Sequence, residues 1–333
     1  MSRGCLDPLA GPPAVPGGLF QPGAVVPNCH PSPRCVERGS HRCDQWLRVT
    51  SAPSRFPGYG LASQSFGVSR ARFARRRARA LFPAAACHQK LAAAAALNSL
   101  AGIARRVTGD YEKYVGGVPV SALEIGAGRD LAVPIALRHI GVEKVFASDV
   151  SRLARLDLIQ HAANRLLGTD SHFQSWDDLD RFGIIYLAPH RVTAADMEVE
   201  CSCSNEVLEH VPPDQLVELL AGLRAVTTGL TTHSIDYSDH FARSDGSISR
   251  LNFLRYSDEQ WRPFNSGKQY VNRLRHSDYL RLFREAGFAI VEESSALGEP
   301  PRDVIDNIAP QFRHYEPSDL FAIKGRIIAR PGG

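Results

Sequence analysis

The chain has few cysteines and no long hydrophobic run. Its seven cysteines, an odd number among 333 residues, follow no regular spacing, so no disulfide framework is indicated. The most apolar stretch, residues 91–104, is short, dominated by alanine and followed by two arginines, which favours a covering helix over a membrane span. These absences predict a reduced, cytoplasmic protein without a membrane span.

Acidic residues are scarce in the first part of the chain. Residues 1–100 contain 13 Lys/Arg against 3 Asp/Glu, and ten of the 22 prolines precede Gly60. Such a composition rarely packs a core, so we expect residues 1–83 to be a disordered or low-complexity leader, with a transit peptide or a wrongly placed start as alternatives. The arginine cluster at 71–80 would suit RNA, but the mildly acidic remainder argues against a nucleic-acid partner.

A third glycine is missing from the turn motif in residues 120–131, VSALEIGAGRDL. The segment predicts a strand, a tight turn at Gly126 and Gly128, and the start of a helix. A dinucleotide fold requires G-x-G-x-x-G, and here Leu131 stands at the third position. Glu124, just before the turn, would repel a pyrophosphate and suits a cationic or amino-bearing ligand instead.

A second apolar run, KVFASDV, ends at Asp149, 21 residues after Gly128. Nucleotide-binding α/β units place at this point the acid that binds the ribose hydroxyls. Two strand ends are therefore predicted to face one ligand.

Residues 203–211, CSNEVLEHV, follow a short β-rich run. Together with the turn, this segment resembles the class I S-adenosylmethionine-dependent methyltransferases. Their first motif is an acidic residue followed by x-G-x-G, with a further glycine often two positions on, and many carry S-x-x-V-L-E-H after the fourth strand. Asp130 stands where the further glycine is expected, which is the one departure from the first motif.

The resemblance covers residues 84–331 and implies one Rossmann-like α/β domain. The implied domain contains a seven-stranded, mostly parallel sheet with helices on both faces and the last strand antiparallel. The implied cofactor is S-adenosyl-L-methionine. The resemblance implies that Glu124, Gly126 and Gly128 line its methionine end, that Asp149 binds its ribose, and that Ser204 joins this cofactor-binding set.

Apolar periodicity predicts the order of the elements. Strands are expected at 120–125, 144–148, within 182–196, at 199–204 and 230–241, with helices at 129–139, 151–166 and 213–228. A later helix is expected between Ser277 as N-cap and Gly287 as C-cap, before two strands that the resemblance makes an antiparallel pair. Residues 236–276 lack a clean period and are interpreted as an insertion over the site.

Polar side chains near the predicted carboxyl ends of the fourth and fifth strands are the catalytic candidates: Glu206, Glu209, His210, His233, Asp236, Asp239 and His240. We select His210, which follows the fourth strand directly, and His240 with Asp236, which could act as base and orienting partner. The structural alternatives are that His210 packs at a helix start and that His240 lies in a solvated loop. Several of these side chains could ligate a metal, but their spacing does not demand one, so no metal site is predicted.

The predicted activity is transfer of a methyl group to an oxygen, or less favourably a nitrogen, of a small molecule or glycan. Arg273 and Arg275 would suit an anionic substrate, although arginines before a helix are commonly surface charges. Two alternatives stay open: an RNA methyltransferase that uses the basic N-terminal arm, and an inactive cofactor-binding regulator.

Overall fold

A computed structural model describes residues 94–168, 172–193, 197–265 and 270–333. The predicted leader, residues 1–83, lies outside these ranges. Within them, no helix combines the length and the apolar character that crossing a membrane requires.

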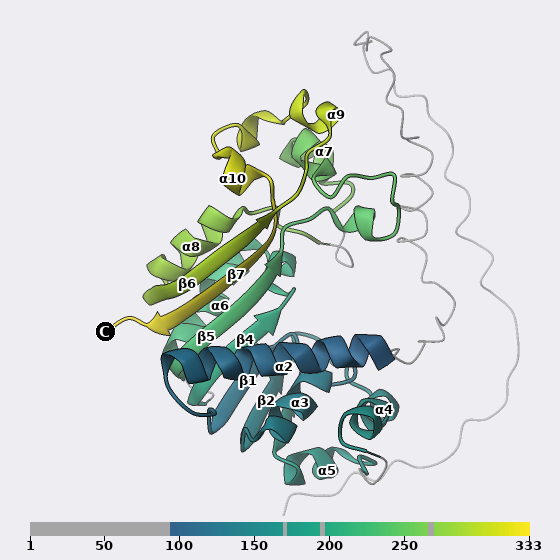
Figure 1. Ribbon diagram of the computed structural model, residues 1–333, viewed down its shortest axis with the longest axis vertical. Coiled ribbons are helices and arrows are strands. Elements are labelled where there is room, and N and C mark those ends of the chain that lie inside the picture. The colour runs from purple at the N-terminus through teal and green to yellow at the C-terminus, as the bar shows by residue number, and fades with distance from the viewer. Residues whose placement is uncertain (1–93, 169–171, 194–196, 266–269) are drawn as a thin grey trace, which may run out of the picture. The chain divides into compact units, whose positions relative to one another are not determined.

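Seven strands form one sheet in the order β3-β2-β1-β4-β5-β7-β6 (Figure 1). Their bounds are β1 Ser121–Ile125, β2 Lys144–Ser148, β3 Ile184–Leu187, β4 Val199–Asn205, β5 Thr227–Asp236, β6 Phe288–Leu297 and β7 Ala322–Pro331. β1 to β5 pair in parallel, whereas β7 is antiparallel to both β5 and β6. The predicted fold class, with its antiparallel last strand, is confirmed.

Helices cover both faces of the sheet because its central strands bury side chains on both sides. Ala122 belongs to the core beneath α2, α3 and α4, and the next residue, Leu123, belongs to the core beneath α6 and α8. Near-continuous apolar strands of this kind are typical of parallel sheets. The helix bounds are α2 Ala94–Tyr114, α3 Ala132–Ile140, α4 Leu156–Leu166, α5 Trp176–Arg181, α6 Pro213–Val226 and α8 His276–Glu285.

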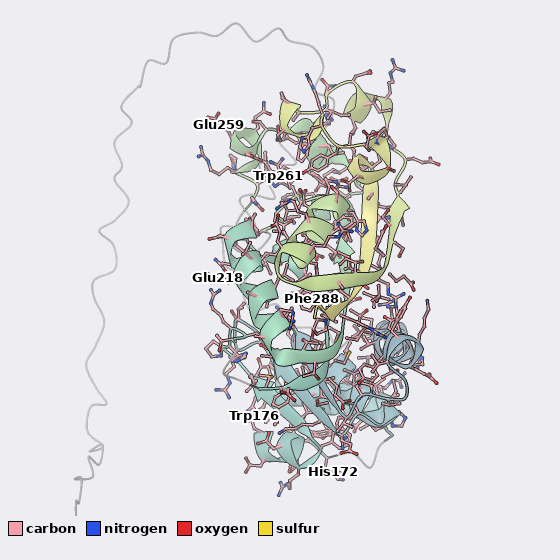
Figure 2. All side chains as sticks on the ribbon, turned by 90° about the vertical axis from the view of Figure 1, so that its left-hand side faces the viewer. His172, Trp176, Glu218, Glu259, Trp261 and Phe288 are labelled. Atoms are coloured by element: carbon pink, nitrogen blue, oxygen red, sulfur yellow. The ribbon has the colours of Figure 1, made fainter. Side chains whose placement is uncertain are left out.

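The interpretation of residues 236–276 as an irregular insertion is wrong in part. The segment carries the 3-10 helices η2 His240–Arg243 and η3 Asn252–Arg255 and the helix α7 Asp258–Trp261. Around Trp261, their side chains pack with those of residues 304–321. This second segment begins within α9 Arg302–Ile305 and contains η4 Pro310–Phe312 and α10 Pro317–Leu320. We call residues 241–264 and 304–321 the aromatic lobe; in Figure 2 Trp261 marks it, while Phe288 marks the core under α8.

The predicted caps of α8 are displaced. Arg275, not Ser277, is the N-cap, and its backbone N–H donates to Asp278 Oδ2 at 2.9 Å. The Ser277 hydroxyl donates to Asp319 instead. Ala286 is the C-cap, and Gly287 follows with a φ of 88°, a left-handed conformation that glycine adopts without strain.

Candidate functional site

The glycine turn follows β1 and is hydrogen-bonded to the carboxyl end of the neighbouring strand β2. Gly126 and Gly128 both have a φ of 74°, and the backbone N–H groups of Gly126 and Ala127 donate to the Ser148 carbonyl. After the turn, Asp130 accepts a hydrogen bond from the Ala132 N–H, and the buried Leu131 adopts a φ of 49° before α3 begins. Asp130, the departure from the family's motif, thus supports the start of this helix.

Gly126 makes room for the Val-Leu-Glu-His segment. A Cβ atom on Gly126 would lie 2.5 Å from Cγ2 of Val207, too close for two carbon atoms that are not covalently linked. The glycine motif and the segment after β4 are therefore in direct contact. Glycine is thus required at position 126 because Val207 packs against it, and not only to let a ligand approach the turn.

We expect Gly126→Ala to lower the free energy of unfolding by about 2 to 5 kcal/mol, from left-handed strain together with overpacking against Val207. Gly117→Ala is the matched control, because Gly117 has a φ of 70° and open space around its Cα; strain alone costs about 1 to 2 kcal/mol there. Urea unfolding gives both values. If Gly126→Ala costs no more than Gly117→Ala, the contact with Val207 does not constrain the turn.

Asp149 lies at the end of β2, directly beside the turn. Its Oδ2 accepts from the Gly128 N–H at 3.3 Å, its Oδ1 accepts from the Ser151 N–H at 3.0 Å, and the side chain is 8% exposed. Each carboxylate oxygen has a second lone pair. Asp149 can therefore hold the turn and still accept hydrogen bonds from a ligand.

Glu124 is a buried acid without a hydrogen-bond partner for its Oε2. Burial, together with the nearby carboxylates of Asp130 and Asp149, raises the pKa of Glu124 to about 8. A buried carboxylate of this kind is stabilised by a cation. The residues at the turn thus fit a ligand with a positively charged amino group and polar hydroxyls.

Ser204 lies at the carboxyl edge opposite Ile125, but its hydroxyl is bound to Nδ1 of His233 at 2.7 Å. Thr231 holds the other ring nitrogen, and burial lowers the pKa of His233 to about 3. The candidate His233 is therefore a neutral side chain inside the sheet, not a base at its mouth. Ser204 links β4 to β5, and its role at the cofactor stays a prediction.

His210 and His240 come together at the carboxyl ends of β4 and β5. His210 ends the 3-10 helix η1, Leu208–His210, and its ring centre lies 4.9 Å from that of His240. Nδ1 of His210 is 2.7 Å from the Tyr270 carbonyl, and burial with the neighbouring His240 and Arg243 charges keeps the pKa of His210 below its usual value despite that hydrogen bond. Two of the three selected residues are thus direct neighbours.

Asp236 joins the same cluster by a different contact from the one predicted. Its Oδ2 is 3.6 Å from Nε2 of His240, too long for a hydrogen bond, and instead accepts from Arg243. Burial alone would raise the pKa of Asp236, but contacts with His240, Ser238 and Arg243 outweigh it and hold the pKa well below its usual range. Asp236 is an anion paired chiefly with arginine.

Glu209 is the second buried acid without a partner. Its side chain is 1% exposed and neither carboxylate oxygen makes a hydrogen bond. Burial raises the pKa of Glu209 to about 8, although the nearby backbone of Glu209 and Asp236 offsets part of the effect. Glu209, His210 and His240 bring one ligand atom each to within 4.8 Å of one another.

Asn272, which the sequence alone did not single out, holds this segment in place. Its Nδ2 donates to the carbonyls of Leu208 and Val211, and its backbone N–H donates to the Glu209 carbonyl. Arg243 was also missed, although it lies only three residues after His240. It pairs with Glu206, which has a φ of 54°, as well as with Asp236.

Three further candidates have structural roles. Asp239 caps η2 and accepts from Nδ2 of Asn252 at 2.9 Å. Arg275 is fully buried and donates to the carbonyls of Tyr237, Asp319 and Ala322, while Arg273 pairs with Asp258. Neither arginine is placed to receive an anionic substrate, and neither is a surface charge.

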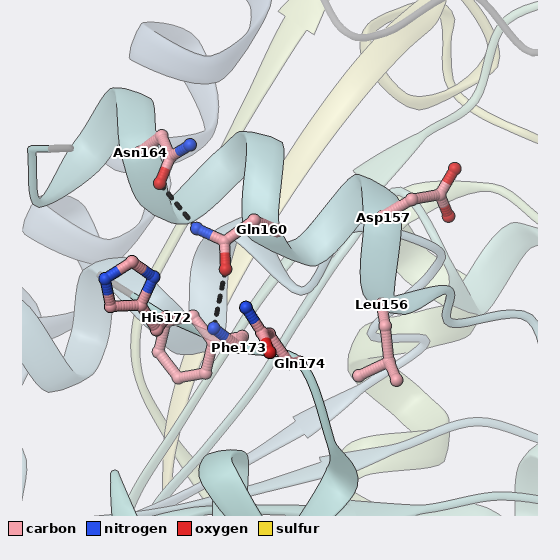
Figure 3. Close-up of a pocket in the computed structure, with 7 residues that line it drawn as sticks. All are labelled: Leu156, Asp157, Gln160, Asn164, His172, Phe173 and Gln174. Carbon is pink, nitrogen blue, oxygen red and sulfur yellow. Dashed lines mark hydrogen bonds between the residues drawn. The ribbon is translucent and has the colours of Figure 1, made fainter. Parts of the chain in front are cut away.

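A cavity of about 490 Å³ lies beside α4 (Figure 3). It is lined by Leu156, Asp157, Gln160, Asn164, His172, Phe173 and Gln174. Gln160 spans it with hydrogen bonds to Asn164 and to the Phe173 N–H. None of the candidate residues lines this cavity.

No protein-family model and no curated protein matches the sequence. Among solved structures, magnesium protoporphyrin IX methyltransferase from Synechocystis with bound SAH is similar, at 12% identity and a TM-score of 0.42, over 78% of this chain and 94% of that one. An O-methyltransferase family protein from Burkholderia thailandensis is 9% identical with a TM-score of 0.40, over 71% and 57% of the two chains. Both TM-scores lie below 0.5, so the class of fold follows from the strand order and not from these proteins.

Proposed function

We propose that the chain is a methyltransferase that uses S-adenosyl-L-methionine to methylate an oxygen, or less favourably a nitrogen, of a small molecule or glycan. The observation that carries this proposal is that Glu124 and Asp149 lie near the carboxyl ends of the neighbouring strands β1 and β2, beside the same glycine turn. When bound, S-adenosylmethionine supplies an activated methyl group on a sulfonium.

The residues of the turn would hold the cofactor in separate ways. The buried carboxylate of Glu124 would face its amino group, since a cation is what this unpartnered oxygen lacks. Asp149 would accept hydrogen bonds from the ribose hydroxyls with its free lone pairs. Leu131 fills the place where a dinucleotide fold needs glycine, which disfavours a pyrophosphate at the start of α3.

The acceptor would be held at the cluster beyond β4 and β5. Glu209, His210 and His240 gather polar atoms there, and Asn272 and Tyr270 fix the segment that carries the first two. Methyl transfer depends chiefly on how two reactants are positioned, and a hydroxyl acceptor also has to lose its proton. In this proposal, His210 and His240 would orient that hydroxyl and accept its proton, and Asp236, 3.6 Å from Nε2 of His240, would stabilise the resulting positive charge.

Isotope labelling tests the reaction and the acceptor class together. The full chain is incubated with S-adenosylmethionine labelled in its methyl group and with separate small-molecule, glycan and RNA fractions. We expect label in the small-molecule or glycan fraction. Label released by ribonuclease would support the RNA methyltransferase, and bound S-adenosylhomocysteine without any transfer would support the inactive regulator.

The raised pKa of Glu124 predicts that cofactor binding depends on pH. An ammonium group beside Glu124 favours its carboxylate, so binding should release a proton below about pH 8. The affinity for S-adenosylhomocysteine should therefore rise as the pH increases from 6 towards about 8. Calorimetry in buffers with different ionisation enthalpies measures the proton directly.

Glu124→Gln is the matched variant, because it keeps the shape of the side chain and cannot ionise. We expect it to bind with a weaker pH dependence and to release no proton from this site. Equal proton release in the wild type and in Glu124→Gln would show that Glu124 does not face the cofactor's amino group.

A further inference from the structure

The side chains of Glu209, His210 and His240 converge from two separate 3-10 helices, and their ligand atoms lie within 4.8 Å of one another. We propose that these three residues bind a divalent transition-metal ion such as Zn²⁺. In a tetrahedral site with bonds of about 2.0 to 2.2 Å, the donor atoms lie about 3.3 to 3.6 Å apart. Binding of the ion would therefore require the three side chains to move towards one another by about an ångström.

Glu209 provides the strongest evidence that a cation belongs here. The Glu209 carboxylate is 1% exposed and makes no hydrogen bond, so its burial carries a desolvation cost that the nearby backbone offsets only in part. The nearby guanidinium of Arg243 is already shared between Asp236 and Glu206. A metal ion among the three side chains would supply the missing positive charge.

Each of the two histidines has a ring nitrogen that could bind a metal ion. Because a carbonyl oxygen can only accept, the contact with Tyr270 makes Nδ1 of His210 the donor and leaves Nε2 with a free lone pair. Metal-binding histidines commonly have their other nitrogen fixed by a backbone carbonyl in this way. Nε2 of His240 is buried without a hydrogen-bond partner, 3.6 Å from the Asp236 carboxylate.

The ligand set indicates the kind of ion. Two imidazoles favour zinc and its neighbours over magnesium, which prefers oxygen ligands. Two histidines and one glutamate form a three-ligand site with one position left for water or substrate. That an acceptor oxygen occupies this position rests on the proposed function, whereas binding of the ion does not.

The test is a titration of the chelator-treated full chain with Zn²⁺ alone, followed by dialysis and elemental analysis. We expect one equivalent in the wild type. The variants Glu209→Gln, His210→Ala and His240→Ala should each lose more than about a hundredfold in affinity, since loss of a mere supporting hydrogen bond costs 10- to 100-fold. His314→Ala, an exposed histidine of the aromatic lobe, should keep the full equivalent.

A visible absorption spectrum with Co²⁺ in place of Zn²⁺ reports the ligands directly and should change in each of the three variants. Wild-type protein that retains no stoichiometric ion, or variants that bind like the wild type, would overturn the proposal. S-adenosylhomocysteine binding, measured separately on chelator-treated protein, distinguishes the two hypotheses. Protein that binds S-adenosylhomocysteine but takes up no Zn²⁺ in the titration refutes the metal site alone, and protein that takes up Zn²⁺ but does not bind S-adenosylhomocysteine refutes the proposed cofactor alone.

Discussion

Asp149→Ala is expected to lower the affinity for S-adenosylhomocysteine by about a hundredfold or more. Hydrogen bonds to a charged group contribute about 1.5 to 3 kcal/mol each, and about 1.4 kcal/mol corresponds to a tenfold change in Kd. Asp149 would lose its contacts with the ribose and also its two hydrogen bonds to the turn. Calorimetric titration of both proteins measures the difference.

Two further variants separate ribose binding from support of the turn. Asp149→Asn keeps an oxygen that can accept from the Gly128 N–H and should bind with an intermediate affinity. Asp306→Ala removes an exposed acid paired with Arg302 and should bind like the wild type. Equal affinity in the wild type and in Asp149→Ala would refute the placement of the ribose.

His240→Ala is expected to reduce turnover by about 10²- to 10⁴-fold, the range typical for loss of a group that handles a proton in the transition state. The same loss is expected if His240 acts through a bound ion, because that ion would no longer be held. Affinity for S-adenosylhomocysteine should stay within about twofold, since the proposed cofactor contacts are made by other residues. The assay uses the acceptor identified by isotope labelling.

His210→Ala should show the same separation of turnover from cofactor affinity, because its ring contacts that of His240. His314→Ala is again the control and should keep full activity. Full activity in both His240→Ala and His210→Ala would remove the histidines from the reaction.

The parallel half of the sheet could be predicted closely from the sequence. β1 and β2 are short, largely apolar runs that end at a glycine and an aspartate, and β4 is a short β-rich run that ends at a polar turn. Each strand therefore has a boundary visible in the residues themselves. Cys201 and Cys203 in β4 are both buried free thiols. The antiparallel strand β7 came from the resemblance, not from the residue pattern.

The aromatic lobe could not be predicted because its helices are three or four residues long. A hydrophobic period needs several turns to become visible, and the lobe is held by rings that meet only in three dimensions, such as Phe241, Trp261 and Phe312. The same limit explains the errors at Arg273 and Arg275. Their guanidinium groups are buried and donate to backbone carbonyls of segments far away in the sequence. The residues next to Arg273 and Arg275 in the sequence do not indicate these contacts.

The sequence was enough to predict which residues belong to the candidate site, but not which contacts they make with one another. Glu209, His210 and His240 were all among the candidates, but their convergence depends on β4 and β5 ending side by side in parallel register. His233 failed as a candidate because β5 is covered on both faces, so a histidine before the strand end is buried. The pairing of Asp236 with Arg243 rather than with His240 likewise requires the folded loop.

The turn after β1 is proposed to bind S-adenosylmethionine and not a dinucleotide. The most direct measurement is a calorimetric titration of the full chain with S-adenosylhomocysteine and, separately, with NAD⁺. We predict saturable one-to-one binding of S-adenosylhomocysteine and no binding of NAD⁺ at the same concentrations. Binding of NAD⁺ alone, or of neither compound, would refute S-adenosylmethionine as the cofactor.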